Sequence, residues 1–223
     1  MKLEDKKLII FDLDGTLIDS GDDLALALNI TLQELGRQEF SEATIHQWVG
    51  NGAQTLVKRA LSGSVDIDKN IDSALFQKAL QLFLAHYKKN VCVKTKLYPN
   101  VKNTLQTLQN RGYTLAIVTN KPIGFVPKIL EVLQIEQYFE LTLGGDSLQE
   151  KKPSPMPLLH VCSELGFLPQ ESVMVGDSKN DILAAKAASM DSIGVTYGYN
   201  YGEEISIYEP TFSVDEFTKI IEL

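Results

Sequence analysis

The chain has 223 residues, of which 44% are hydrophobic and 22% charged, which suits a soluble globular protein with one large domain or one domain carrying an insertion. Its net charge of -8 argues against a nucleic-acid partner, because proteins that bind nucleic acid usually carry a basic face, but a locally positive site for an anionic small molecule is still compatible with it. No run approaches ~20 apolar residues and the N-terminal residues are charged, so we expect no membrane partner and, by default, a cytoplasmic protein.

The first predicted element is a buried strand over residues 8–11, an apolar run that ends at Asp12. A second carboxylate follows at Asp14, Gly15 lets the backbone turn, and Thr16 can cap what comes next. Like charges this close are costly unless a bound cation or a developing positive charge offsets them. The stretch therefore indicates chemistry rather than packing.

The next part of the chain, residues 22–89, contains no proline and shows helical periodicity. One apolar stripe consists of Leu24, Leu28, Leu32 and Leu35. The turn Gly50-Asn51-Gly52 separates two further helical stretches, the second of which is expected from about Ala53 to Leu61. These patterns predict a unit of roughly four helices, inserted after the first strand and hinged near residues 20–23 and 94–99.

Four short apolar runs rich in β-branched residues follow, at residues 115–118, 141–143, 173–175 and 193–195. They alternate with helical stretches near residues 101–111, 124–134, 156–165 and 181–189. This alternation implies a parallel sheet covered on both faces. We therefore predict an α/β fold in which a Rossmann-like parallel-sheet core domain, residues 1–19 and 95–223, carries an inserted all-helical cap domain, residues 20–94.

Polar residues follow several of these strands. Thr119 and Asn120 come directly after one apolar run, and Asp177 comes just after another. In an open α/β sheet the carboxyl ends of the strands lie along one edge, where ligands bind. We therefore expect these side chains to meet Asp12 and Asp14 although they are far apart in the sequence.

Two further residues are expected near this edge. Asp181 lies in the first helical turn after Asp177, where it can support a cation or belong to a helix-capping cluster, and both can be true at once. Lys152 directly precedes Pro153, which fixes the backbone at the start of a helix. We therefore choose Lys152 over its neighbour Lys151 as the positive charge held at the edge.

In this order, these residues resemble the four motifs of the haloacid dehalogenase-like hydrolase superfamily. The motifs are Asp12-x-Asp14-Gly15-Thr16, Thr119, Lys152, and Asp177 with Asp181. More narrowly, the chain is similar to the bacterial phosphoglycolate phosphatases in stretches spread over nearly the whole sequence, at residues 11–20, 48–53, 118–122, 144–147, 152–158, 175–183 and 198–203. One departure is Gly21-Asp22, where members of that family often carry a proline, and it touches only the hinge.

The resemblance implies a Mg²⁺-dependent phosphatase that hydrolyses 2-phosphoglycolate to glycolate and phosphate through an aspartyl-phosphate. Asp12 would be the nucleophile, and Asp14 would act as the acid and then as the base. Mg²⁺ would bind Asp12, the backbone carbonyl of Asp14, and Asp177. Asp181 would orient the water around the metal.

The same comparison implies the groups that bind the substrate. Thr119 and the amide of Asn120 would hold phosphoryl oxygens, and Lys152 would offset the charge of Asp12 and of the phosphoryl group. The Gly50-Asn51-Gly52 turn precedes a helix start, where free amides favour anions, so we expect it to meet the substrate carboxylate.

Other interpretations stay open at this point. Lys58 and Arg59 are candidates to assist with the carboxylate, although both are more often simple surface charges. The same core residues would serve a phosphatase for other small phosphomonoesters, such as sugar or nucleotide phosphates, or a phosphomutase. A non-catalytic binding module on the same fold is a further alternative. The expected partner is a small phosphorylated acid, and the expected assembly is a monomer or homodimer.

Overall fold

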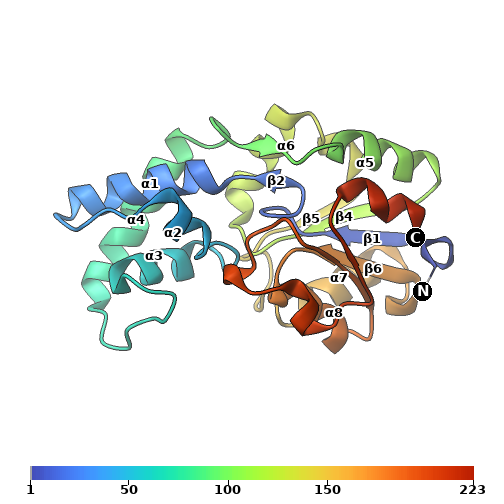
Figure 1. Ribbon diagram of the computed structural model, residues 1–223. Helices are drawn as coiled ribbons and strands as arrows, with labels where there is room; N and C mark the ends of the chain where they lie inside the picture. Colours follow the sequence, from blue (N-terminus) through green and yellow to red (C-terminus); the bar gives the residue numbers. More distant parts are fainter. Residues whose placement is uncertain (1) are drawn as a thin grey trace.

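The computed structural model describes residues 2–223, in which a helical unit lies beside a sheet covered by helices (Figure 1). In this part of the chain one sheet has six strands in the order β5-β4-β1-β6-β7-β8, and all neighbouring strands are parallel. Its strands are β1 (Leu8–Phe11), β4 (Thr114–Val118), β5 (Leu141–Leu143), β6 (Ser172–Gly176), β7 (Asp191–Val195) and β8 (Phe212–Val214). The predicted parallel sheet is confirmed, and the short edge strand β8 was not predicted.

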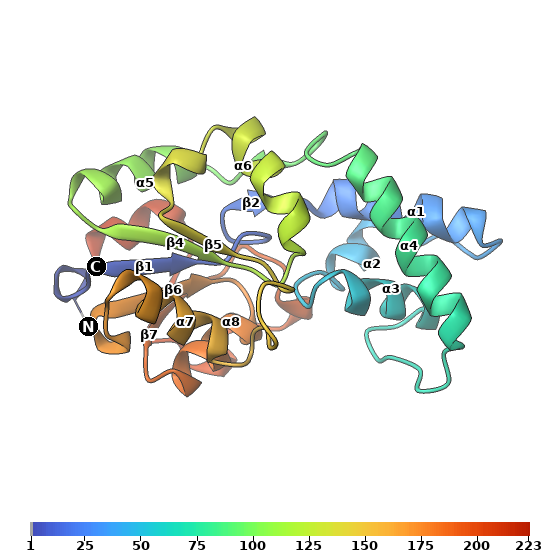
Figure 2. The ribbon, with the colours of Figure 1, turned by 180° about the vertical axis from the view of Figure 1, so that it is seen from behind.

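Helices cover both faces of this sheet, as Figure 2 shows from behind. Helices α5 and α6 lie on one face, and α7 and α8 lie on the other. Their bounds are α5 (Val101–Asn110), α6 (Val126–Leu133), α7 (Met156–Leu165) and α8 (Lys179–Ala187). Helix α8 begins two residues before the predicted start, because Ser178 and Asp181 form a capping box at its N-terminus.

The alternation of side chains along the strands produces two hydrophobic layers. In β1, Ile9 and Phe11 pack towards α5 and α6, whereas Leu8 and Ile10 pack towards α7 and α8. All four side chains are fully buried. A strand with apolar residues on both faces belongs in the middle of a covered parallel sheet, and β1 occupies that place.

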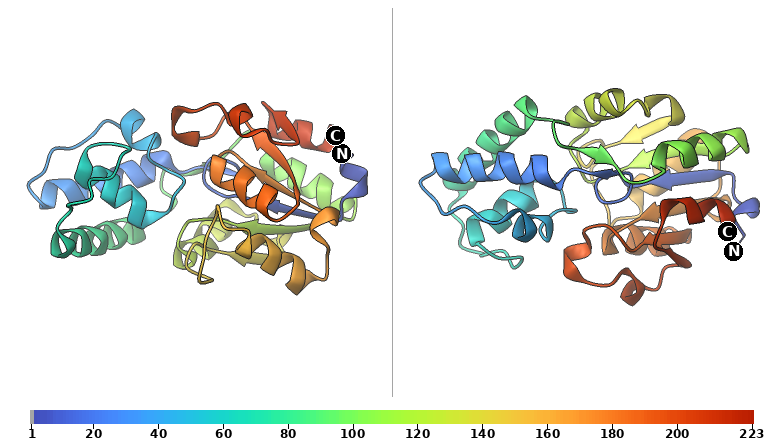
Figure 3. Two further views of the ribbon diagram at one scale, coloured as in Figure 1. Left: turned by 90° about the horizontal axis from the view of Figure 1, so that it is seen from below. Right: turned by 45° about the horizontal axis from the view of Figure 1, so that its top comes forward.

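The helical unit consists of α1 (Gly21–Glu34), α2 (Glu42–His46), α3 (Ala53–Ser62) and α4 (Ser73–Lys89). These helices pack together beside the sheet domain (Figure 3). They enclose a hydrophobic cluster of their own, in which Leu28, Trp48 and Phe83 are buried. The helical character of this segment follows the predicted pattern. The domain boundaries at residues 19/20 and 94/95 stay a prediction.

The chain leaves the sheet and returns to it through two adjacent linkers. Here β2 (Ile18–Asp19) and β3 (Lys96–Leu97) form a short antiparallel pair. The fully buried carboxylate of Asp23 accepts hydrogen bonds from the backbone amides of residues 93–95 and from the hydroxyl of Thr95. Because charge-assisted hydrogen bonds are strong, this carboxylate fastens the two linkers together.

Within residues 2–223, no helix combines the length and the apolar character needed to cross a lipid bilayer.

Candidate active site

The strand ends bring the expected polar residues to one edge of the sheet. Phe11, the last residue of β1, pairs with Ile117 of β4 on one side and with Val175 of β6 on the other. Asp12 therefore lies level with the ends of both neighbouring strands. This edge faces the helical unit (Figure 2), so a ligand bound here lies between the two parts of the molecule.

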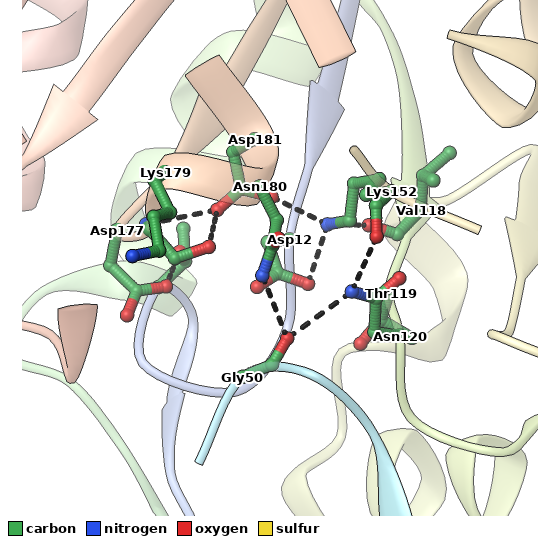
Figure 4. Close-up of polar contacts among 12 residues, drawn as sticks. Asp12, Gly50, Val118, Thr119, Asn120, Lys152, Asp177, Lys179, Asn180 and Asp181 are labelled. Carbon is green, nitrogen blue, oxygen red and sulfur yellow. Dashed lines mark hydrogen bonds and ion pairs between the residues drawn. The ribbon is translucent and has the colours of Figure 1, made fainter. Parts of the chain in front are cut away.

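Lys152 lies at the centre of the polar groups (Figure 4). Its ammonium nitrogen Nζ is 2.9 Å from Asp12 Oδ1, 2.6 Å from Asp181 Oδ1 and 2.5 Å from the carbonyl oxygen of Val118. The residue is only 2% exposed. Burial alone would lower the pKa of Lys152, but Asp12 and Asp181 raise it above its ordinary value, so this lysine is a fixed buried cation.

Three carboxylates form a tight cluster, and two of them, Asp12 and Asp181, contact this cation. Asp12, Asp177 and Asp181 each offer an oxygen, and these oxygens lie within 4.8 Å of one another. Burial raises the pKa of Asp12 to about 7, and the carboxylate of Asp181 adds to the shift although Lys152 opposes it. Burial also raises the pKa of Asp177, with Asp12 and Asp181 adding to the effect. The cluster carries more negative charge than Lys152 neutralises, which is the environment that attracts a divalent cation.

The partners of the three carboxylates differ. Both oxygens of Asp181 are engaged, Oδ1 by Lys152 and Oδ2 by the backbone amide and hydroxyl of Ser178. Asp177 accepts hydrogen bonds from the Thr16 hydroxyl and from the amide of Tyr199. Protein donors thus hold both Asp177 and Asp181 in place, and of these two carboxylates only Asp181 also contacts the Lys152 ammonium.

Gly15 allows the loop after β1 to approach Asp177. Its backbone has φ +89°, and a Cβ built there would lie 2.3 Å from Asp177 Oδ2. Any larger residue at this position would push the carboxylate out of the cluster.

Asp14 lies outside the cluster of Asp12, Asp177 and Asp181, and its hydrogen-bond partners differ from theirs. Its Oδ1 and Oδ2 lie 2.8 and 3.1 Å from Lys121 Nζ, and the Ser20 hydroxyl donates to Oδ1. Burial alone would lower the pKa of Lys121, but the Asp14 carboxylate and the Tyr87 phenol raise it. The sequence analysis assigned no role to Lys121 or Ser20. The signal for Lys121 was its place in the loop after β4, directly beyond Thr119 and Asn120.

Thr119 and Asn120 both border the pocket next to Asp12. The Thr119 hydroxyl oxygen accepts a hydrogen bond from the amide of Lys121. The side chain of Asn120 donates to the carbonyl oxygens of Gly50 and Lys152, at 3.2 and 3.0 Å. Within residues 2–223, the backbone amide of Asn120 donates to no protein acceptor, so it can serve a bound anion.

The Gly50-Asn51-Gly52 turn touches this edge of the sheet. The Gly50 carbonyl accepts hydrogen bonds from Asn120 and, at 3.3 Å, from Asn180 (Figure 4). Gly52 has φ +82°, and a Cβ there would lie 2.7 Å from the carbonyl oxygen of Asn120. Lys151, the lysine that was not chosen, donates to the carbonyl of Asn51 at 2.6 Å.

Arg59, a candidate to assist with the carboxylate, is neither a surface charge nor part of the pocket next to Asp12. It is 8% exposed, and its guanidinium donates to the carbonyl oxygens of Trp48 and Val65. Its charge thus satisfies backbone carbonyls inside the helical unit, because a buried guanidinium needs acceptors for its fixed fork of donors. Lys58 lies with Nζ 4.9 Å from the ring centroid of Phe76. Neither residue borders the pocket next to Asp12.

The pocket itself lies between the strand ends and the helical unit. It encloses about 470 Å³ of empty space, counting the part that is open to solvent. Asp12, Asp14 and Thr119 border it from the sheet, and Gly50 and Gly52 border it from the helical unit. The structure therefore brings all predicted site residues to one region, while their catalytic roles stay predictions.

Comparison with known proteins places the chain in a family. The family model for haloacid dehalogenase-like hydrolases matches residues 9–195. A relative from Colwellia psychrerythraea, named phosphoglycolate phosphatase, is 52% identical over 99% of this chain and 98% of its own length. Another of the same name, from Psychrobacter arcticus, is 48% identical over 98% of this chain and 95% of its own length.

A solved structure agrees with these sequence relatives. The crystal structure of a predicted phosphoglycolate phosphatase from Haemophilus somnus superposes with a TM-score of 0.91 and is 40% identical, covering 98% of this chain and 97% of that one. With the family model covering most of the chain and full-length relatives at about half identity, the chain belongs to the haloacid dehalogenase-like hydrolase family.

Proposed function

We propose that the chain is a Mg²⁺-dependent phosphatase that hydrolyses 2-phosphoglycolate to glycolate and phosphate through an aspartyl-phosphate at Asp12. The observation that carries this proposal is the buried ammonium of Lys152, in contact with Asp12 and Asp181 beside Asp177. Hydrolysis of phosphate monoesters depends mainly on neutralising charge around the transferred phosphoryl group, and this site supplies that charge before substrate binds. The shared name of the relatives supports the choice of substrate.

The residues fit a divalent cation with oxygen ligands. Asp12 and Asp177 are buried acids whose pKa values are raised, so each gains when a cation joins the cluster. These two carboxylates and the backbone carbonyl of Asp14 would hold Mg²⁺, and Asp181 would orient its water. When bound, the ion neutralises phosphoryl oxygens and aligns the ester with the nucleophile.

The first step transfers the phosphoryl group to the enzyme. A carboxylate oxygen of Asp12 attacks phosphorus, a bond from that oxygen to phosphorus forms, and the bond from phosphorus to the ester oxygen breaks. Asp14 gives a proton to the departing alkoxide, which leaves as glycolate. The Thr119 hydroxyl and the Asn120 amide hold phosphoryl oxygens, while Lys152 offsets the charge that Asp12 and the phosphoryl group bring together.

The second step releases phosphate. Asp14, now ionised, takes a proton from a water molecule that attacks phosphorus, and the bond from phosphorus to Asp12 breaks. Asp12 returns as a carboxylate and Asp14 returns protonated, so the cycle closes. The helical unit acts as a cap over this site, and the turn at residues 50–52 faces the ester. The proposal also places the protein in the cytoplasm, as a monomer or a homodimer.

The test is the variant Asp12→Asn, which removes the nucleophile but keeps the shape of the side chain. With Mg²⁺ and 2-phosphoglycolate, turnover should fall below detection while the circular dichroism spectrum stays unchanged. Asp215→Asn is the matched control, because Asp215 is an exposed acid paired with Lys219, and it should keep full activity. Near-normal hydrolysis by Asp12→Asn refutes the covalent step.

A panel of phosphomonoesters tests the substrate. The highest kcat/KM is expected for 2-phosphoglycolate. A higher value for a sugar or nucleotide phosphate would favour a related phosphatase, transfer of phosphate without its release would favour a phosphomutase, and no turnover of any ester would favour a binding module.

A further inference from the structure

The pocket next to Asp12 and Asp14 has a predominantly apolar wall on the side of the helical unit. Among residues 2–223, the large apolar side chains that border it are Leu24, Val49, Leu56, Phe83 and Phe125. The only cationic side chain that borders it in this part of the chain is Lys121. Lys152, by contrast, lies behind Asp12 with its three donors directed at Asp12, Asp181 and Val118.

Lys121 has a defined position at the border of this pocket. It is 5% exposed, and its Nζ contacts both carboxylate oxygens of Asp14. The same nitrogen lies 4.8 Å from the ring centroid of Tyr87, at the distance of a cation–π contact. Phe125 packs edge-on against Tyr87, with 4.9 Å between ring centroids, and helps to fix the phenol beside the lysine.

The hydroxyl of Tyr87 is unusual because it is buried and its proton has no acceptor among the residues that the structure describes. Tyr87 is 1% exposed and borders the same pocket as Lys121. Burial raises the pKa of Tyr87 to about 12, so the phenol remains a donor at neutral pH. A buried donor without an acceptor is costly, and a ligand oxygen in the pocket would satisfy it.

We propose that Lys121 and the Tyr87 hydroxyl together bind the carboxylate of the substrate, an inference that rests on the proposed function. In 2-phosphoglycolate a single methylene group separates the ester oxygen from the carboxylate. Asp14 has to reach that ester oxygen to protonate it, so the carboxylate lies within a few ångströms of Asp14. Lys121, which holds Asp14, is therefore beside the carboxylate as well.

Binding of the substrate carboxylate by Lys121 and Tyr87 gives the polar groups of the pocket a common role. Without substrate, the ammonium of Lys121 contacts only Asp14 among the acidic side chains that border the pocket. With substrate, it lies between Asp14 and the carboxylate, and the phenol donates to a carboxylate oxygen. The start of α3 borders the pocket at Gly52 and Ala53, so its free amides add positive potential from the opposite side. Selectivity for an acid thus arises mainly from the loop after β4 and from α4, rather than from Lys58 or Arg59.

The experiment compares two esters that differ only in the carboxylate, 2-phosphoglycolate and ethyl phosphate. The variant Tyr87→Phe keeps the ring and removes the hydroxyl. It should raise KM for 2-phosphoglycolate about 10-fold, as expected for one hydrogen bond to a charged group, and leave KM for ethyl phosphate within about 2-fold. The matched control is Tyr138→Phe, whose hydroxyl bonds Gln106 away from the pocket, and it should change neither value.

Lys121→Met and Lys121→Arg provide the second measurement. Lys121→Met should lower kcat/KM for both esters, because Lys121 also holds Asp14, but the ratio of kcat/KM for 2-phosphoglycolate to that for ethyl phosphate should fall by a further factor of about 10 or more. Lys121→Arg should restore part of the ratio, since it restores the charge.

The outcomes separate this inference from the proposed function. If the unmodified enzyme does not hydrolyse 2-phosphoglycolate, the proposed function is refuted, and this inference with it. If it does, but Tyr87→Phe and Lys121→Met affect both esters by equal factors, the carboxylate site alone is refuted and Lys121 serves only to hold Asp14.

Discussion

The raised pKa of Asp12 predicts that Mg²⁺ binding releases a proton. In the metal-free protein the carboxyl group of Asp12 has a pKa of about 7, against 3.8 for an ordinary aspartate, because it is buried next to Asp181. A ligand to Mg²⁺ must be ionised, so the metal has to displace any proton that Asp12 carries. The perturbation is therefore the addition of Mg²⁺ to the metal-free protein at different pH values.

The expected magnitude follows from the difference between the two pKa values. A shift of about three units makes ionisation of Asp12 about 4 kcal/mol less favourable than in the unfolded chain. At pH 6 a group with this pKa carries about 0.9 proton, and at pH 7 about 0.5. Mg²⁺ affinity should therefore fall roughly 10-fold for each pH unit below 7.

The raised pKa of Asp12 also determines how the free energy of unfolding depends on pH. Between about pH 4 and pH 7 the folded, metal-free protein holds a proton that the unfolded chain has lost. The free energy of unfolding of the metal-free protein should therefore decrease as the pH rises through this window. Mg²⁺ should restore it, and more so at pH 8 than at pH 5.5.

Isothermal titration calorimetry measures the proton directly. Mg²⁺ is titrated into metal-free protein at pH 6 in two buffers of different ionisation enthalpy, and the dependence of the apparent enthalpy on the buffer gives the number of protons released. We expect at least about 0.9, since Asp177, whose pKa burial also raises, contributes in the same direction. Asp12→Asn should lower the count and Asp215→Asn should not. Binding of Mg²⁺ at pH 6 without proton release would refute the reasoning.

Three other substitutions test the contacts around the site. Asp23→Ala leaves the amides of residues 93–95 without their acceptor and should lower the free energy of unfolding by about 2–4 kcal/mol in urea denaturation; a loss below about 0.5 kcal/mol would contradict the fastening of the linkers. Gly52→Ala places a Cβ against the Asn120 carbonyl and should lower kcat/KM about 10-fold or more, whereas Gly124→Ala, which meets no atom within 4 Å, should not. Tyr199→Phe removes the hydroxyl that accepts from the amides of Ser20 and Gly21, and should cost about 1–3 kcal/mol of stability by thermal denaturation; an unchanged Tm would show that water replaces the phenol.

The central strands were predictable because their sequence signal is strong. The run at residues 8–11 is apolar on both faces, which is typical of a buried parallel strand, and the polar residues after it mark the ligand edge. The strands β2 and β3 were missed, since segments of two residues leave no periodicity to detect, and β8 was missed although it is as long as the predicted β5. Their pairing depends on tertiary contacts that the local sequence does not encode.

The site was predictable where a residue type and a strand end coincide. Asp12, Asp177 and Lys152 are examples, because a resemblance in ordered motifs added to their placement. Lys121 and Arg59 show the limit of this reasoning. Both are basic residues, and only the folded chain reveals that Lys121 holds Asp14 and that Arg59 donates to carbonyl oxygens inside the helical unit. The sequence around a basic side chain does not indicate which group will accept its hydrogen bonds.

The carbonyl of Gly50 is a point at which hydrogen bonds hold the helical unit against the edge of the sheet. Asn120, in the loop after β4, and Asn180, in the first turn of α8, donate hydrogen bonds to this carbonyl, and Lys151 donates to the carbonyl of the next residue, Asn51. The Asn51 side chain adds a fourth hydrogen bond, to Asn180. An outward swing of the helical unit has to break all four, and at about 1 kcal/mol each only roughly one molecule in a thousand would stand open at rest. An arriving ester therefore meets a site that is closed in most molecules. Tight closure shields the phosphoryl transfer from bulk solvent but slows capture of the ester, and the strength of these hydrogen bonds sets the balance between the two.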